Sequence, residues 1–387
     1  MPALVGVPCS ATPRPIEPLE FREVPAPCYS IGVDLLADVE HAIRAAAGVA
    51  PFDFEGLALR VFTHQYAQVA PYRQLCDRRG ISPTTVVAWT DIPPVPTRAF
   101  RYADLNSAPP EAIFRTSGTS DGPDARGRHL VPRLSLYRAA ALPAFERFVL
   151  GDGARLRCLF LLPDPQLRPD SSLVHMCDWV AAASGTPGEW FVDAQGLDVP
   201  RLVARLAAAQ TSGEAILLAG PTAGFVHLFE TGGRFRLGPG SRVMDTGGAK
   251  GMTRPWSRAG FLRACWTHLG IPGYFCINEY GMTELCSQRY DSALDDRLHG
   301  RSLAPRRLVA PPWLRTRVLD PDTLAPVAAG ATGLLCHHDL ANAGSVAVVL
   351  TEDLGRTVGG DGIEVLGRVP GAVPRGCGQL LAAMEPR

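Results

Sequence analysis

One short segment carries several side chains that could handle a nucleotide, a metal ion and an acyl group together. It reads Asn-Glu-Tyr-Gly-Met-Thr-Glu over residues 278–284 and follows the apolar run 274–277, where a strand would break into a turn. Thr283 offers a hydroxyl to a phosphate or carboxylate, and Glu284 offers the hard oxygen ligand that Mg²⁺ prefers. Tyr280 offers a flat surface to an aromatic ring. The three kinds of group could therefore meet at this turn.

A second segment, Thr-Ser-Gly-Thr-Ser-Asp-Gly over residues 116–122, is rich in glycine and hydroxyl groups. The backbone N–H groups of such a turn can wrap a polyphosphate, but no Gly-Lys-Ser/Thr follows, so this is not a Walker A loop. Asp121 would repel a triphosphate. The nearby basic side chains that could offset its charge are Arg126, Arg128 and His129. The nucleotide-binding residues expected here are Thr116, Ser117, Gly118, Thr119 and Ser120; an ordinary Ser/Thr turn is the alternative.

Further segments after strand-like runs could complete a nucleotide site. Residues 246–251 read Thr-Gly-Gly-Ala-Lys-Gly, and two adjacent glycines would let a flat ring approach the backbone. A plain strand-to-helix loop is the alternative, and Lys250 could contact a phosphate or stay solvated. Asp353 lies in Thr-Glu-Asp-Leu-Gly after residues 346–350, and Arg368 ends a Leu-Gly-Arg sequence. Neither of these last two sequences is informative in isolation.

The segments stand in the order and approximate spacing of the acyl-adenylating (AMP-forming) superfamily. The chain resembles the short acyl-protein synthetase branch of the bacterial bioluminescence aldehyde pathway, which is related to phenylacetate–CoA ligase. The resemblance covers most of the chain and includes residues 89–96, 170–173, 367–371 and 375–377. Asp121 departs from the family, which usually has glycine at that place.

The resemblance implies ATP and Mg²⁺ as reactants, with coenzyme A as a possible thiol. Mg²⁺ on Glu284, together with Thr283, would stabilise the transferring phosphate, so these two residues are expected to be catalytic. Asp353 would accept hydrogen bonds from both ribose hydroxyls, with Arg368 nearby. Beyond the 116–120 loop, the expected nucleotide-binding residues are Thr246, Gly247, Gly248, Lys250, Tyr280, Asp353 and Arg368.

Cys377 lies near the C-terminus in Pro-Arg-Gly-Cys-Gly. Flanking glycines predict an accessible, mobile tail thiol, and Arg375 would favour its thiolate form. In the resembled branch a cysteine in this context accepts the acyl group as a thioester, so Cys377 is expected to be catalytic. An idle exposed thiol in a tail is the alternative.

Two other groups of residues could bind ligands. An acyl pocket is expected to involve His175, Trp179, Gly220, Pro221, Phe225 and His227, although apolar residues at helix spacing are more often plain core. His337 and His338 suggest a metal site at first sight. Adjacent strand residues point to opposite faces, however, so the two cannot easily share a metal ion.

The elements that must position these residues alternate between helix and strand. Helical patterns cover 31–79, 134–150, 172–183, 198–209, 225–229 and 257–269, and strand-like runs cover 156–162, 215–219, 242–245 and several short stretches after 315. This alternation predicts a layered α/β protein with partly parallel sheets. We expect an N-terminal helical or irregular region of the large domain (1–110), an α/β core with the nucleotide and acyl sites (111–300), and a β-rich subdomain with the C-terminal tail (301–387). The mobile C-terminal lysine domain of full-length relatives is expected to be absent, because no lysine follows Arg368.

Composition narrows the class of protein. A formal net charge of zero argues against a nucleic-acid binder. The sequence contains no stretch of about 18 uncharged apolar residues, so no membrane span is expected. The N-terminus lacks the basic region of a signal peptide. The ten cysteines form no Cys-x-x-Cys pair, which disfavours zinc and a disulfide framework. We therefore expect a cytoplasmic protein with mostly buried, reduced cysteines.

The preferred interpretation is an acyl-adenylating ligase. It would activate a carboxylic acid as acyl-AMP and transfer the acyl group to a thiol of Cys377, of an acyl carrier protein or of coenzyme A. One alternative keeps the fold without ATP: an acyltransferase would move an acyl group from acyl-CoA through Cys377 to an acyl carrier protein. Another is a non-catalytic partner of an acyl carrier or reductase. Fatty, aromatic and amino-aromatic acids all suit an apolar pocket with a few polar groups.

Overall fold

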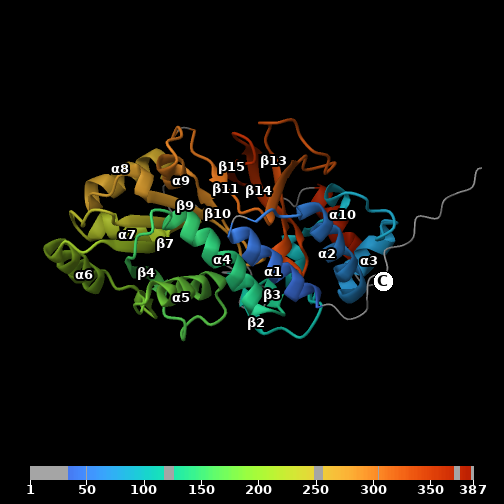
Figure 1. Ribbon diagram of the computed structural model, residues 1–387, viewed down its shortest axis with the longest axis horizontal. Helices are drawn as coiled ribbons and strands as arrows, with labels where there is room; N and C mark the ends of the chain where they lie inside the picture. Colours follow the sequence, from blue (N-terminus) through green and yellow to red (C-terminus); the bar gives the residue numbers. More distant parts are fainter. Residues whose placement is uncertain are drawn as a thin grey trace, which may run out of the picture. The chain divides into compact units, whose positions relative to one another are not determined.

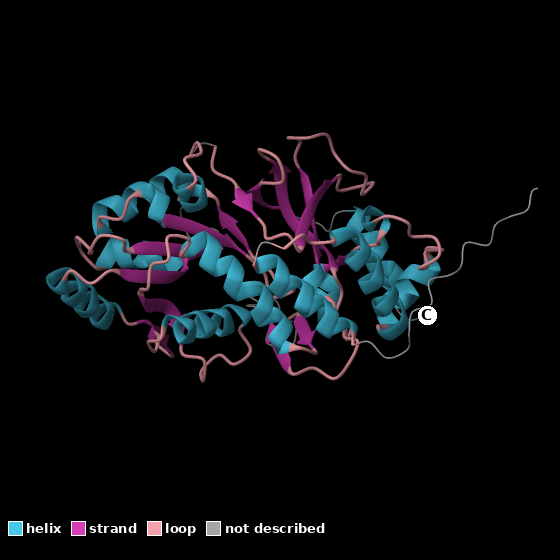
Figure 2. Ribbon diagram, in the orientation of Figure 1, coloured by secondary structure: helices cyan, strands magenta, loops and turns pink. Residues whose placement is uncertain are grey.

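The computed structural model describes residues 34–48, 50–116, 126–247, 256–303, 305–369 and 375–384. Figures 1 and 2 show helices packed on a large sheet, and this mixed α/β architecture confirms the predicted fold class. Residues 34–387 fold as one unit. Among the helices of the described residues, none is long and apolar enough to cross a membrane.

Thirteen of the described strands form one sheet that changes character at β9. On one side, β9, β8, β7, β4 and β5 follow one another in parallel, with β6 antiparallel at the edge. On the other side, β10, β11, β15, β14, β13 and β12 are antiparallel, and β1 joins β14 in parallel. Their bounds are β1 Val95–Pro96, β4 Arg157–Pro163, β5 Glu189–Asp193, β6 Gly196–Leu197, β7 Ile216–Pro221, β8 Arg242–Thr246, β9 Cys276–Tyr280, β10 Arg289–Asp291, β11 Leu308–Val309, β12 Leu314–Leu319, β13 Gly333–Asp339, β14 Val348–Thr357 and β15 Ile363–Arg368. A separate pair is formed by β2 (Ala112–Arg115) and β3 (Arg128–Val131).

Local sequence signals explain where several helices begin. Asp34, Asp53, Asp198 and Ser257 each accept a hydrogen bond from a backbone N–H of the following first turn. The helices are α1 Leu35–Ala47, α2 Phe54–Gln68, α3 Ala70–Arg78, α4 Leu134–Val149, α5 Ser172–Ser184, α6 Val199–Ser212, α7 Thr222–Thr231, α8 Arg258–Leu269, α9 Ala293–Leu298 and α10 Arg375–Met384, with a 3₁₀ helix η2 at Thr97–Arg101. Most predicted helices are present, but the sequence did not predict α9 or α10.

Side-chain alternation along the parallel strands separates two apolar layers. Ala219 of β7 faces the layer that contains α4 and α5, whereas Leu218 faces α6, α7 and α8. Strand β9 follows the same rule, with Ile277 on the α4–α5 side and Cys276 on the other. This alternation decides which side chains at the strand ends reach each side of the site.

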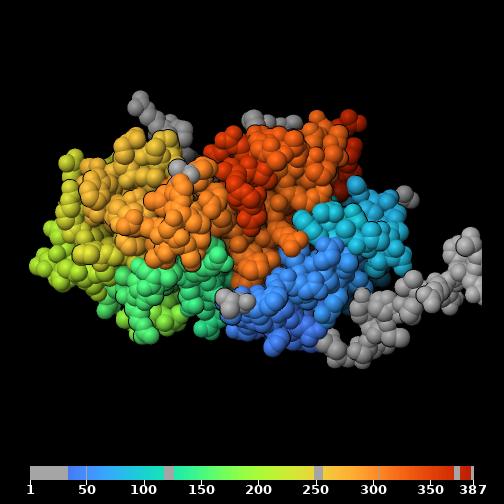
Figure 3. Space-filling view, turned by 45° about the horizontal axis from the view of Figure 1, so that its top comes forward, coloured from blue at the N-terminus to red at the C-terminus, as the bar shows by residue number. Residues whose placement is uncertain are grey.

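Three segments expected to follow strands are parts of strands instead. Strand β9 continues through Tyr280, so the turn begins only at Gly281. Asp353 and Arg368 lie within β14 and β15, where they are directly opposite each other in the antiparallel pairing. Figure 3 shows these C-terminal strands, in orange and red, packed beside the N-terminal helices, in blue and cyan.

The cysteines confirm the expectation of small buried side chains. The eight in the described ranges are free and buried: Cys76, Cys158, Cys177, Cys265, Cys276, Cys286, Cys336 and Cys377. In the case of Cys377, burial contradicts the expected exposed tail.

Candidate active site at the ends of the parallel strands

A cavity of about 990 Å³ opens at the carboxyl ends of β7, β8 and β9. Thr222 follows β7, Thr246 ends β8 and Tyr280 ends β9, and all three line the cavity. Neighbouring parallel strands end at the same edge of a sheet, which is where α/β proteins usually bind ligands. The cavity lies where the parallel part of the sheet meets the antiparallel part.

Tyr280, Asp353 and Arg368 form one side of the cavity, which we call the C-terminal wall. The Tyr280 hydroxyl donates to Asp353 Oδ2 at 2.8 Å, and Arg368 Nε donates to Asp353 Oδ1 at 3.1 Å. Burial and the nearby Asp353 raise the pKa of Tyr280 well above its usual value, so the phenol keeps its proton. Three residues expected to bind the nucleotide are thus brought together around one carboxylate.

A buried polar chain that the sequence did not reveal supports this wall. His337 Nε2 lies 3.3 Å from the Tyr280 hydroxyl, and Thr316 Oγ1 lies 2.8 Å from His337 Nδ1. Arg289 donates to the same Thr316 hydroxyl at 2.7 Å. Burial keeps the pKa of His337 well below its usual value, with Arg289 acting in the same direction. His338 contacts Trp89 edge-on instead, so the two histidines point apart.

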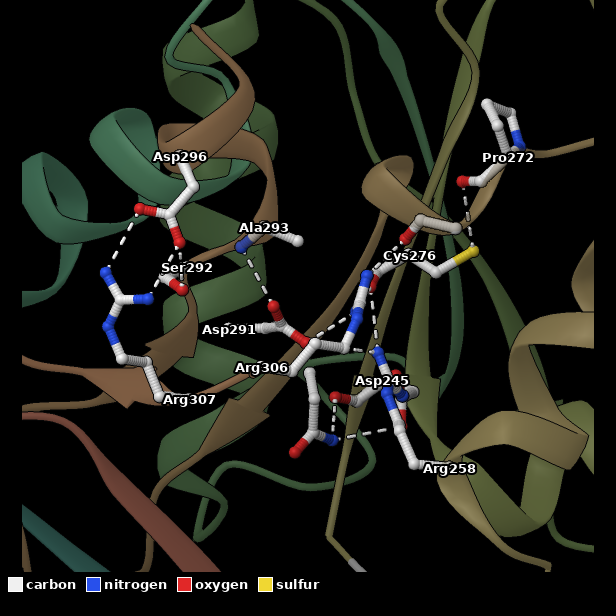
Figure 4. Close-up of polar contacts among 12 residues, drawn as sticks. Asp245, Arg258, Pro272, Cys276, Asp291, Ser292, Ala293, Asp296, Arg306 and Arg307 are labelled. Carbon is white, nitrogen blue, oxygen red and sulfur yellow. Dashed lines mark hydrogen bonds and ion pairs between the residues drawn. The ribbon is translucent and has the colours of Figure 1, made fainter. Parts of the chain in front are cut away.

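A network of ion pairs fixes the strand ends (Figure 4). Arg258 donates to Asp245 Oδ1 at 2.6 Å and to the Cys276 carbonyl at 2.8 Å. Arg306 donates to Asp291 Oδ2 at 2.6 Å. Asp245 Oδ2 also accepts hydrogen bonds from Thr222 and Asn278. Strands β8, β9 and β10 and the start of α7 are therefore cross-linked beside the cavity.

The opposite side of the cavity, which we call the α5 wall, is formed by Tyr137, Ser172, Leu173, Met176, Glu279 and Gln288. Glu279 is only 3% exposed, and its carboxylate accepts a hydrogen bond from the Thr246 hydroxyl. Burial raises the pKa of Glu279 to about 7, although the Thr246 hydrogen bond opposes this shift. A Cβ at Gly281 would collide with the Glu279 carboxylate, which explains the glycine at that position. The acidic Glu279, two residues after the apolar Ile277 on the same side of β9, was a signal that sequence reasoning missed.

Thr283 and Glu284 also line the cavity, as their expected catalytic role requires. The Thr283 carbonyl lies 2.8 Å from Nδ1 of His129, which is buried. Burial lowers the pKa of His129 to about 4, so this ring is neutral near pH 7. It therefore cannot offset the charge of Asp121.

The glycine- and hydroxyl-rich loops are only partly described. Thr116 and Gly247 line the cavity, and Gly247 has a positive φ of 74°. The Thr116 hydroxyl accepts a hydrogen bond from Gly127 N at 2.9 Å. The remaining expected residues of these loops lie outside the described residues: Ser117, Gly118, Thr119, Ser120, Asp121, Gly248 and Lys250.

Several arginines that were not expected line the cavity together with Arg368, which was. Arg126 is paired with Asp170 at 2.5 Å and Arg128 with Asp104 at 2.8 Å, so their charges are already matched. The cavity-lining arginines are Arg98, Arg101, Arg115, Arg168, Arg258 and Arg368. Within the described residues, the Arg115 guanidinium has no hydrogen-bonding or ionic partner. It directly precedes Thr116, a position that sequence inspection could have noticed.

The structure corrects the expected acyl pocket, because none of its six residues lines the cavity. Phe225 is fully buried against Phe261, and His227 is exposed. His175 packs on Phe114, and Trp179 packs behind Tyr137. Gly220 lies against Leu161, and Pro221 precedes α7. His175 and Trp179 belong to α5, but the residues of α5 that line the cavity are Ser172, Leu173 and Met176.

The expectation of a mobile, thiolate-like Cys377 is also wrong. Cys377 lies in α10 and is 2% exposed. Burial raises its pKa to about 11, and Glu352 adds to this shift while Arg98 opposes it. The flanking Gly376 allows close packing, since a Cβ there would collide with Leu324. Arg98 and Glu352 form an ion pair at the cavity wall, so the thiol lies close to the cavity but is covered.

Several known proteins are similar to this chain. A family model described as acyl-protein synthetase, LuxE, matches residues 53–384. The chain is 26% identical over 309 residues to a long-chain-fatty-acid–luciferin-component ligase of Aliivibrio fischeri, covering 77% of this chain and 78% of the relative. The corresponding ligase of Vibrio harveyi is 25% identical over 334 residues, covering 82% and 84%.

Solved structures support the fold. Two structures of 2-hydroxyisobutyryl-CoA ligase are similar to this chain. One, an open conformation with 2-HIB-AMP and CoA, has a TM-score of 0.56 at 18% identity and covers 81% of this chain and 73% of that one. The other, in the postadenylation state, has a TM-score of 0.59 at 16% identity and covers 86% and 67%. With a family model spanning most of its length, the chain is an enzyme that belongs to the LuxE acyl-protein synthetase family.

Proposed function

We propose that this enzyme converts a carboxylic acid and ATP into an acyl adenylate and pyrophosphate, and then transfers the acyl group to a thiol. The observation that carries the proposal is the meeting of Thr116, Thr246, Glu284, Asp353 and Arg368 around one cavity. These residues come from five separate segments of the chain. A protein that only bound a partner would not need them assembled at the ends of parallel strands.

The C-terminal wall suits the ribose of a nucleotide. Asp353 is held by Tyr280 and Arg368, so its carboxylate is oriented before any ligand arrives. A carboxylate can accept about four hydrogen bonds, which leaves capacity for two ribose hydroxyls. The Thr246–Gly247 turn offers exposed backbone for a flat base, and the cavity arginines offer positive charge for phosphates.

The donor set fits Mg²⁺ bound mainly through substrate phosphates. Glu284 is the expected protein ligand, and Thr283 adds a hydroxyl on the same side. The described residues contain no cluster of three metal-ligating side chains. Mg²⁺ commonly uses one or two carboxylates together with phosphates and water, so one such side chain is sufficient. When bound, Mg²⁺ would neutralise phosphate charge during transfer.

Chemically, a carboxylate oxygen of the acid attacks the α-phosphorus, and the bond to pyrophosphate breaks. A thiolate then attacks the acyl carbonyl, and AMP leaves with the electron pair of the carbon–oxygen bond. The positive charges of Arg115 and Arg368 would stabilise the phosphate oxygens through the first step. In the second step the acceptor is a thiolate, because the thiol itself is a poor nucleophile.

The final acceptor is a thiol of Cys377, of an acyl carrier protein or of coenzyme A. For Cys377 to act, α10 must expose the buried sulfur and its pKa must fall from about 11. The named relatives act on long-chain fatty acids, so an apolar acyl chain is the expected substrate core. A reductase that consumes the acyl thioester would be a suitable partner.

The test is acid-dependent formation of AMP from ATP, measured with a panel of acids and with Mg²⁺. Asp353→Ala is expected to abolish most of this activity. A matched control is Glu364→Gln, on the same β15 strand as Arg368, where Glu364 pairs with Arg356 at the surface. Acyl transfer from acyl-CoA without ATP, and no AMP with any acid, would contradict the proposal.

A further inference from the structure

We infer that the acid carries a hydrogen-bond donor, an amine or a hydroxyl, which binds between Glu279 and Gln288 on the α5 wall. This inference rests on the proposed function, because it names the class of acid that the same cavity accepts. It makes Glu279 a residue that determines substrate specificity. The donor could belong to a hydroxylated or an amino-substituted acid.

Strand alternation places Glu279 on the acyl side of the cavity. Tyr280, the next residue of β9, points to Asp353 in the C-terminal wall. Glu279 must point to the opposite face, because successive strand side chains alternate. Ile277, two residues earlier, confirms this direction by packing in the α4–α5 layer. The Glu279 carboxylate helps to raise the pKa of Tyr137 in α4 and of Cys177 in α5, so it lies near both helices.

The α5 wall contains polar atoms that the protein itself does not satisfy. Glu279 is 3% exposed, yet among the described residues it accepts a hydrogen bond only from Thr246. Gln288 is 5% exposed, and its Oε1 has no partner in the same part of the chain. Buried polar groups in proteins are nearly always hydrogen-bonded. An unpaired amide oxygen and a carboxylate with a single partner both line this cavity, and together they point to a ligand that donates to them.

The two side chains lie beside the same glycine. Both lie next to Gly281: a Cβ at that position would collide with Glu279 Oε1 and would lie 3.2 Å from Gln288 Cγ. Around them the wall is apolar, with Leu173 and Met176 of α5 and the ring of Tyr137. An acid with an apolar body and one donor group would match this lining.

A polar site of this kind discriminates strongly. An analogue that lacks the donor would leave Gln288 Oε1 without a partner and Glu279 with Thr246 alone. Sites that hydrogen-bond a substrate group reject analogues that lack the group by up to about 10⁴-fold. With two acceptors in a partly open cavity, we expect a preference of about 10²-fold in kcat/KM. A purely apolar pocket would instead favour the plain acid over the donor-bearing acid, and only by a small factor.

The experiment compares matched acids that differ only in the donor: an alkanoic acid with its hydroxy and amino derivatives, and benzoic acid with its hydroxy and amino derivatives. Both kcat/KM for AMP formation and the dissociation constant of the acid, measured by calorimetry without ATP, are determined. The proteins are wild type, Glu279→Leu, Glu279→Gln and the surface control Glu364→Gln. The dissociation constant for ATP is measured for each variant, to verify that the substitution leaves ATP binding unchanged.

The inference predicts that wild type and the control prefer a donor-bearing acid by about 10²-fold, and that Glu279→Leu loses this preference while binding ATP normally. Glu279→Gln keeps the shape of the side chain but not its charge. This variant should weaken the binding of the amino-substituted acids more than that of the hydroxy-substituted acids if the donor is an amine, so the comparison identifies the donor. If Glu279→Leu does not fold, Glu279→Gln and Gln288→Leu provide the same comparison.

Equal use of plain and donor-bearing acids by wild type would overturn the inference, as would a preference that survives in Glu279→Leu. Failure of the proposed function would give a different result from failure of this inference. In that case no acid would yield AMP, and calorimetry would still show whether donor-bearing acids bind more tightly than plain ones.

Discussion

The two walls of the cavity differ in how far the protein satisfies its own polar groups. In the C-terminal wall, Asp353 is held by two hydrogen bonds, and Tyr280 is linked through His337 to a buried chain. In the α5 wall, Glu279 has one hydrogen bond and Gln288 Oε1 has none among the described residues. Under the proposed function, the first wall would be a preformed nucleotide site, whereas the second would be completed by the acid.

This contrast separates shared chemistry from substrate choice. All acyl-adenylating enzymes bind the same nucleotide, ATP. A rigid, preorganised wall would suit this constant ligand, because less freedom is lost on binding. The acid differs from one enzyme to another, and its wall contains the residue next to Tyr280 that points the other way. Changes in the C-terminal wall should therefore affect all acids equally, and changes in the α5 wall should affect them selectively.

The largest effect is expected for Glu284→Gln, which removes a negative charge from the cavity lining outside both walls. Loss of one electrostatic contact in a transfer step costs about 10²–10³-fold in kcat, or about 3–4 kcal/mol. The loss should be the same for every acid and should lessen at high Mg²⁺. Rates measured across a Mg²⁺ series check this, and wild-type rates throughout would exclude the metal role of Glu284.

Glu279→Gln should stabilise the protein at high pH. Burial raises the pKa of Glu279 from 4.5 to about 7, so the folded state favours the protonated form. That stability is fully present below about pH 4.5 and is lost as pH rises through 7. Glutamine cannot ionise, so the variant should gain about 3 kcal/mol relative to wild type at pH 8 and nothing at pH 4.

Urea unfolding of Glu279→Gln and wild type between pH 4 and pH 9 measures this difference. The exposed Glu364→Gln change is the control and should show no such pH dependence. A constant difference between Glu279→Gln and wild type at all pH values would mean that Glu279 is not buried as the structure shows.

A smaller effect is expected for Asp353→Asn. The amide keeps one acceptor but loses the charge that pairs with Arg368. The KM for ATP should rise about 10-fold, or about 1.4 kcal/mol, by the same factor for every acid. Steady-state kinetics with two unlike acids check this. A change confined to one acid would remove the distinction between the walls.

The smallest effect is expected for Cys377→Ala. A buried sulfur is lost from the core, so the free energy of unfolding should fall by about 1 kcal/mol. An exposed tail would give no change. Cys377→Ser should be worse than Ala, because its hydroxyl would be buried in an apolar setting. A hydroxylamine-sensitive acyl adduct of equal yield on Cys377→Ala would exclude this thiol as the acceptor.

The sequence predicted the C-terminal wall better than the α5 wall for a physical reason. Tyr280, Asp353 and Arg368 stand in short sequences whose order resembles that of the acyl-adenylating superfamily. The residues of the α5 wall depend on how a helix is rotated. Ser172, Leu173 and Met176 line the cavity, whereas His175 and Trp179 of the same α5 helix contact each other's rings instead. Helical spacing marks a face but not the neighbour that this face meets.

Cys377 could not be placed from sequence because flanking glycines suggested a mobile tail. Tertiary packing overrides this preference: α10 lies against α3 and η2, and Gly376 fits where a larger residue would collide with Leu324. Glu279 could have been found. An acidic residue one position from Tyr280 must face the other side of the strand, and that side is otherwise apolar.

The central claim is that an oxygen of the acid attacks the α-phosphorus of ATP. The most direct measurement uses an acid labelled with ¹⁸O in its carboxylate, followed by mass spectrometry of the AMP released after acyl transfer. We predict that this AMP contains one ¹⁸O atom in its phosphate, because the carbon–oxygen bond breaks in the second step. Acyl transfer with unlabelled AMP, or without AMP, would contradict the account.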